Sequence, residues 1–123
     1  MIGFEDFILQ DGIPIYLQIL AYVKRGAVAG VIRDGDELPS RRMLSALLGV
    51  NPNTVQRAYK QLEEEGLIAS HAGAKSLMVL DEKQVARLRK ELLAEEARSV
   101  IGKLKQMGLS KQEAAALLDT YWE

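Results

Sequence analysis

The sequence predicts a mainly α-helical fold with a small β-hairpin, and three observations lead to this prediction. Apolar residues recur at spacings of three and four over most of the 123 residues, which is the period of amphipathic helices. Capping residues and glycines stand at the ends of these periodic segments, where helices begin and end. Residues 67–70 and 77–80 have the character of two short strands around a loop.

The N-terminal part of the chain predicts an arm, a helix and a turn. Residues 1–12 contain apolar side chains without a clear period, which indicates an arm or a short strand. Pro14 suits the first turn of a helix, because its missing N–H would have no partner there. That helix ends near Gly30. Residues 34–36 predict a turn, and residues 37–39 are extended because the residue before a proline avoids the helical region.

Two short helices follow, separated by a glycine turn. Ser40 is a suitable N-cap for the first, and Gly49 supplies the left-handed residue that ends it. Asn51 followed by Pro52 is an N-cap and first-turn pair, so the second helix begins there and runs to about Glu65. The first helix is expected to direct three leucines inward: Leu44, Leu47 and Leu48.

The C-terminal part predicts a wing and two more helices. The strands at 67–70 and 77–80 form a small hairpin, or wing. From Asp81 onward the pattern becomes helical, and one side of a long helix ending at Gly108 carries an apolar stripe of Val85, Leu88, Leu92, Leu93, Ala97, Val100, Ile101, Leu104 and Met107. Ser110 and Glu113 form a capping box for a last helix. We therefore expect a winged helix-turn-helix domain over 1–80 and a helical tail over 81–123.

Composition excludes several classes of protein. The chain has no cysteine and one histidine, so disulfides and thiolate metal sites are excluded and no metal or cofactor is expected. No apolar run approaches the roughly 20 residues of a membrane span. The N-terminus lacks the features of a signal peptide. We expect a cytoplasmic protein that is not an enzyme, because the sequence has no phosphate-cradling glycine loop and no evident carboxylate pair.

The helix that begins at Pro52 separates an apolar side from a basic and amide side. At about 100° per residue, the apolar side is expected to be Val55, Ala58, Tyr59 and Leu62. The opposite side carries Asn53, Arg57 and Lys60, with Thr54 and Gln56 on the flanks. These side chains suit the edges of DNA bases. The alternative is an ordinary solvated face, but no acidic residue occurs from Leu38 to Leu62.

Two arginines also indicate contact with phosphates. Arg41 and Arg42 stand in the first turn of their helix, where the dipole disfavours cations. The alternative is that they only aid solubility. The net charge of −1 argues mildly against nucleic acid, but acidic residues cluster outside the proposed contact surface.

Several motifs, in this order, are similar to those of GntR-type winged-helix transcription regulators. They are Leu38-Pro39-Ser40-Arg41-Arg42, Leu48-Gly49-Val50-Asn51-Pro52-Asn53-Thr54-Val55, and the segment from Tyr59 to Ile68, with Pro14 to Ile19 resembling the first helix of that domain. The resemblance covers residues 13–79, and the short tail resembles the YtrA-like subgroup. It implies a homodimeric bacterial repressor that binds double-stranded DNA at a palindromic operator.

The resemblance also implies which residues contact DNA. Carried over by position, these are Arg42, Asn53, Thr54, Gln56 and Arg57, with Ser40 and Arg41 near phosphates, while Lys60 lies on the same face. The wing departs from the family pattern, because it lacks the usual Arg- and Gly-rich turn. Gly73 is retained, Lys75 can reach a phosphate, and His71 is expected on the surface of the wing or at a phosphate.

The tail is expected to pair with the tail of a second copy. Its stripe needs a partner, and the dimerisation candidates are Val85, Leu88, Leu92, Val100 and Leu104. The alternative is a monomer whose tail folds back on its own winged helix. Two such helices are too small to enclose a ligand pocket, so any small-molecule effector is expected at the dimer interface or between the tail and the DNA-binding domain. Tyr121 and Trp122 are either wall residues of that site or packing aromatics.

One alternative function remains at this point. A winged helix can serve as a protein–protein interaction module that does not bind DNA, and the altered wing keeps this alternative open.

Overall fold

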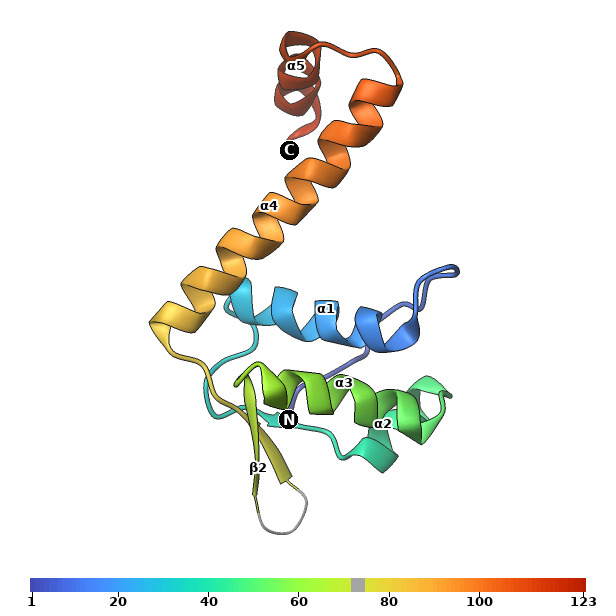
Figure 1. The fold of residues 1–123 in the computed structure, drawn as a ribbon, viewed down its shortest axis with the longest axis vertical. Helices are drawn as coiled ribbons and strands as arrows, with labels where there is room; N and C mark the ends of the chain where they lie inside the picture. The colour runs from blue at the N-terminus through green and yellow to red at the C-terminus, as the bar shows by residue number, and fades with distance from the viewer. Residues whose placement is uncertain (72–74) are drawn as a thin grey trace. The chain divides into compact units, whose positions relative to one another are not determined.

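The computed structural model describes residues 1–71 and 75–123, which form five helices and three short strands (Figure 1). The chain divides into two compact units, Met1–Leu88 and Arg89–Glu123. The first unit contains α1 (Ile15–Val28), β1 (Glu37–Leu38), α2 (Arg41–Leu48), α3 (Pro52–Glu64), β2 (Ile68–His71), β3 (Lys75–Met78) and the first turns of α4 (Glu82–Gln106). The second contains the rest of α4 and α5 (Lys111–Tyr121).

The core of the first unit lies where α1 packs against α3. Ile19 and Val23 of α1 have no exposed surface, and neither do Val55, Tyr59 and Leu62 of α3. Apolar spacing of three and four brings these residues to one side of each helix. Burial of such side chains contributes about 1.5–3 kcal/mol each. The two helices therefore form a fixed platform for the other elements.

A small antiparallel sheet closes one side of this unit. The strand order is β1-β3-β2, with Glu37 opposite Leu77 and Ile68 opposite Met78. The turn before β1 is tied to the end of β3, because the Gly35 amide donates to the Met78 carbonyl and the Leu80 amide donates to the Asp34 carboxylate, both at 2.8 Å. The wing hairpin is thus anchored to the preceding turn.

The N-terminal arm lies across the same unit and forms neither helix nor strand. The Ile2 amide donates to the Glu37 carbonyl at 2.8 Å, and Phe4 is buried against Tyr22 with ring centroids 4.8 Å apart. The arm therefore contributes aromatic packing to the core.

The two tail helices begin at well-defined caps. At the start of α4, the amide of Asp81 donates to the side chain of Gln84, and the amide of Gln84 donates to the side chain of Asp81. Ser110 and Glu113 form the predicted capping box at the start of α5. No helix in the described part of the chain is long and apolar enough to cross a membrane.

The predicted fold class is confirmed, and two details differ. Leu44 is fully buried as expected, but Leu47 is 63% exposed, so the prediction that it faces inward is wrong. The extended segment at Glu37 pairs with β3 and makes the hairpin a three-stranded sheet. The first compact unit ends at Leu88, which is 1% exposed and belongs to the core cluster of that unit.

Candidate nucleic-acid interface

Helix α3 presents a polar face opposite its buried stripe. Val55, Ala58, Tyr59 and Leu62 have no exposed surface, as the sequence predicts. On the other side, Asn53, Gln56, Arg57 and Lys60 are exposed and Thr54 is half-buried. The helix begins at the predicted cap, where the Asn51 side chain accepts a hydrogen bond of 2.8 Å from the Asn53 amide.

Helix α2 is held against α3 by a short turn. The side chain of Ser40 caps α2 by accepting from the Met43 amide, and Gly49 ends the helix with φ of 67°. The Ser45 hydroxyl donates to the Val50 carbonyl at 2.7 Å, which closes the turn between the two helices. These bonds define a helix-turn-helix in which the start of α3 is held at the surface.

Arg57 is held by an aromatic side chain from another helix. Its guanidinium carbon lies 3.9 Å from the centroid of the Tyr16 ring, and its Nη2 donates to the Tyr16 hydroxyl at 3.2 Å. A shallow recess of about 560 Å³ lies here between the starts of α1 and α3. Sequence reasoning missed this contact, since only the crossing of α1 and α3 brings Tyr16 to Arg57.

The other two candidate arginines have different environments. Arg41 lies over the ring of Tyr59 at 5.1 Å, and its Nη2 is 3.8 Å from a carboxylate oxygen of Glu63. The buried Nε of Arg41 has no hydrogen-bond partner among the described residues. Arg42 is exposed and makes no side-chain hydrogen bond or ion pair within the described part of the chain. Glu63 is thus an acidic neighbour that sequence reasoning did not connect with Arg41.

The wing carries an exposed histidine and an exposed lysine where β2 ends and β3 begins. Lys75 begins β3 and is paired in register with His71 of β2, and both are exposed. Gly73, the third wing position predicted to contact DNA, lies outside the described residues.

The residues predicted for dimerisation have unequal exposure. Val85, Leu92 and Leu104 are half-buried and Val100 is 44% exposed. Leu88 instead lies in the core of its own winged helix, because the first turns of α4 complete that core. Leu88 is therefore not available to pair with a second copy.

Tyr121 and Trp122 lie at the end of the tail. They are 78% and 80% exposed, so neither is packed within this chain.

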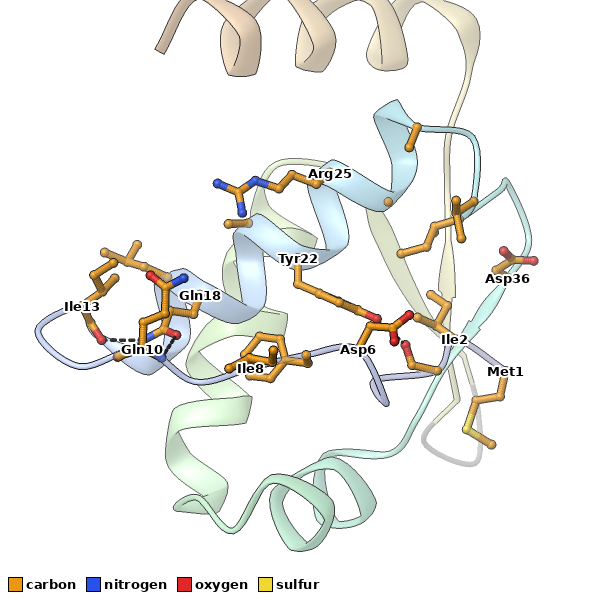
Figure 2. Close-up of a pocket in the computed structure, with 18 residues that line it drawn as sticks. Met1, Ile2, Asp6, Ile8, Gln10, Ile13, Gln18, Tyr22, Arg25 and Asp36 are labelled. Carbon is orange, nitrogen blue, oxygen red and sulfur yellow. Dashed lines mark hydrogen bonds between the residues drawn. The ribbon is translucent and has the colours of Figure 1, made fainter. Parts of the chain in front are cut away.

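A groove of about 880 Å³ lies between the N-terminal arm and α1. Figure 2 shows how the arm is tied down beside it: the Gln18 side chain donates to the carbonyls of Gln10 and Ile13, and it accepts from the Gln10 amide. Apolar side chains such as Ile8 and Leu17 dominate its walls. No sequence pattern indicated this groove, because the arm has no periodicity. Among the described residues, no group of three His, Cys, Asp or Glu side chains is placed to bind a metal ion.

The helix-turn-helix with its wing defines the class of protein: a winged-helix domain with an exposed basic and amide helix face. The model of the family "Bacterial regulatory proteins, gntR family" matches residues 15–75. The chain is 32% identical over 114 residues to the uncharacterized HTH-type transcriptional regulator YhcF of Bacillus subtilis, covering 93% of this chain and 94% of that protein. The chain therefore belongs to the GntR family of bacterial transcription regulators, which are not enzymes.

Two further comparisons support this assignment, and the first of them is with a YtrA-type protein. It is 47% identical over 60 residues to the HTH-type transcriptional repressor YtrA of Bacillus subtilis, a match that covers 49% of this chain and 46% of YtrA. The structure of a GntR family transcriptional regulator from Listeria monocytogenes superposes with a TM-score of 0.80 at 31% identity, over 91% of this chain and 98% of that one.

Proposed function

We propose that this regulator is a homodimeric repressor that binds a palindromic operator with α3 in the major groove. The observation that carries this proposal is the exposed face of α3, where Asn53, Gln56, Arg57 and Lys60 lie opposite a fully buried stripe. Arginine reads guanine and asparagine or glutamine reads adenine in the major groove. The similarity to the repressor YtrA supports repression over activation.

The phosphate contacts are assigned to residues around this face. Arg42 is exposed without a side-chain partner among the described residues, and Arg41 and Ser40 stand at the start of the same helix. Lys75 of the wing is exposed and supplies a further cation. Phosphate contacts fix the register of a protein on DNA but carry no sequence information.

The tail is proposed to pair with that of a second copy through a seam on α4. Leu93, Ala97, Val100, Leu104 and Met107 recur at alternating spacings of four and three, which is a heptad pattern. Leu93, Val100 and Met107 are 52%, 44% and 69% exposed. Val85 and Leu92 lie about 100° around the helix from the middle of this seam, so we place them at its edge. A twofold dimer would set two copies of α3 about 34 Å apart, which matches successive half-sites.

The proposed place of action is the cytoplasm, where an operator on the bacterial chromosome is accessible. The lack of cysteine agrees with a reducing compartment.

The test is a selection of bound fragments from the source genome, followed by fluorescence anisotropy with the selected duplex and a scrambled duplex. Arg57→Ala should weaken binding of the selected duplex by about 1–3 kcal/mol and relax one base preference. Arg42→Ala should weaken both duplexes alike and flatten the salt dependence. Arg98→Ala, an exposed arginine on α4, is the charge-matched control. A selection that returns no enriched sequence contradicts the proposal.

Repression is tested separately from binding. A reporter gene placed behind the selected operator should be expressed less when the parent chain is present and should regain expression with Arg57→Ala. Increased expression with the parent chain would identify an activator.

A further inference from the structure

We propose that Tyr16 is a specificity-determining positioning residue, which holds the guanidinium of Arg57 in the orientation that reads a base. The proposal deepens the proposed function and rests on it. It is carried by the contact between α1 and α3, in which the Tyr16 ring and hydroxyl both engage Arg57.

The contact restrains Arg57 in two ways at once. The ring lies 3.9 Å from the guanidinium carbon, so a face of the guanidinium is covered by the aromatic ring. The hydroxyl accepts from Nη2 at 3.2 Å, which fixes rotation of the guanidinium. An arginine has five N–H donors in its plane. Stacking and one hydrogen bond therefore leave donors for the paired acceptors of guanine.

Tyr16 is itself well fixed. It is half-buried and packs against the core, and it stands one turn from the fully buried Ile19. The Pro14 carbonyl accepts from the amides of Leu17 and Gln18, which orders the first turn of α1 around it. The ring is therefore a rigid support for a long side chain that would otherwise lose much conformational entropy on binding.

Two of the three arginines near the interface, Arg57 and Arg42, differ in a way that matches this role. Arg57 is restrained but still exposed, whereas Arg42 is exposed with no side-chain partner among the described residues. A mobile cation suffices for a phosphate, but reading a base edge requires a fixed geometry. Of Arg57 and Arg42, the restrained side chain is therefore the one for which orientation matters.

The experiment measures the ratio of dissociation constants for scrambled and selected duplexes at one salt concentration. Tyr16→Phe keeps the ring and removes the hydroxyl, while Tyr16→Leu removes both and keeps apolar packing. Since fixing one long side chain changes binding by about 0.5–1.5 kcal/mol, Tyr16→Leu should lower the ratio by about two- to tenfold. Tyr16→Phe should lower it less, and binding of the scrambled duplex should change little in both.

Tyr22→Phe is the matched control, because Tyr22 lies on the same helix but donates its hydroxyl to the Gly3 carbonyl. A double-mutant cycle provides the decisive comparison: in the Arg57→Ala background, Tyr16→Leu should have no further effect on the ratio. Thermal unfolding of each variant identifies losses that come from the fold alone.

Two results would overturn the proposal while leaving the proposed function intact. In the first, the parent discriminates between the two duplexes and the Tyr16→Leu variant has the same ratio of dissociation constants as the parent. The other is an equal loss for both duplexes that follows a lower unfolding temperature, which would make Tyr16 merely structural. A parent that does not discriminate at all would overturn the proposed function, and this inference with it.

Discussion

The buried hydroxyl of Tyr59 donates a hydrogen bond of 2.7 Å to the carbonyl oxygen of Pro39. Tyr59 lies in the buried stripe of α3, and Pro39 lies in the segment that leads from β1 into α2. This hydrogen bond joins α3 to the segment at the start of α2. The Arg41 guanidinium lies over the same ring at 5.1 Å, so the bond also fixes the surface on which Arg41 rests.

Tyr59→Phe should lower the free energy of unfolding by about 1–2 kcal/mol, because the buried Pro39 carbonyl would lose its donor while the ring stays in place. Urea denaturation at neutral pH measures this change. Tyr22→Phe is the control, since its hydroxyl bonds to Gly3 at an exposed site and water can replace it. Equal losses in the two variants would show that the Tyr59 hydroxyl has no special structural role.

The same tyrosine should make stability depend on alkaline pH. Burial raises the pKa of Tyr59, although the nearby Arg41 guanidinium acts in the opposite direction. In the unfolded chain a tyrosine ionises near pH 10. The contribution of neutral, buried Tyr59 to the free energy of unfolding is therefore fully present below about pH 10. It is lost as the pH rises through the pKa of Tyr59 in the folded protein. Tyr59→Phe lacks this loss, so its stability should approach that of the parent above about pH 10. If the free energies of unfolding of Tyr59→Phe and the parent differed by the same amount at every pH, this role of Tyr59 would be contradicted.

Glu63→Gln should strengthen binding to any DNA duplex, because it removes the carboxylate that lies 3.8 Å from Arg41. The pair is partly exposed, so the expected gain is about threefold, within the range of surface ion pairs. Binding should also become more sensitive to salt, since Arg41 would gain a phosphate. Glu95→Gln, an exposed position on α4, controls for the change in net charge. Weaker binding by Glu63→Gln would mean that Glu63 positions Arg41 instead of competing with DNA for it.

Gly26 in α1 should be intolerant of a side chain, although it is not in a special backbone conformation. A Cβ atom there would lie 2.5 Å from Cδ1 and 2.8 Å from Cγ1 of Ile32, which is itself buried. Overpacking of this kind costs about 1–3 kcal/mol and exceeds the helix-propensity gain of alanine, about 0.5–1 kcal/mol. Gly26→Ala should therefore destabilise the fold in thermal denaturation. The loss should shrink in the Ile32→Val background, and an unchanged loss there would place the clash elsewhere.

Helix periodicity explains why most of α3 could be predicted from the sequence. The turn of about 100° per residue is a local property, so Val55 and Leu62 were assigned correctly to the buried side. Caps are local as well, and Ser40, Asn51 and Ser110 each accept the hydrogen bond expected of them.

What the sequence did not reveal depends on contacts between distant segments. Tyr16 and Arg57 are 41 positions apart, and only the crossing of α1 and α3 brings them together. Leu88 belongs to the same sequence stripe as Leu92, but the first turns of α4 use it to complete a core that the pattern does not identify. Helix α2 has only eight residues, which is too short for periodicity to decide that Leu47 faces outward.

Val100→Asp should disrupt the proposed dimer without unfolding the winged helix, since Val100 is 44% exposed and lies in the second compact unit. A charge in the heptad seam loses apolar burial and meets its own copy across the twofold axis. We expect a monomer in sedimentation velocity and operator binding weakened by at least about tenfold, because one half-site alone is then bound.

Gly102→Ala is the matched control on the opposite side of α4, where a Cβ would meet nothing within 4 Å. It should stabilise the helix by about 0.5–1 kcal/mol and leave the dimer intact. An intact dimer in Val100→Asp would place the interface on another surface, and dissociation by both variants would show that α4 pairs through more than one face.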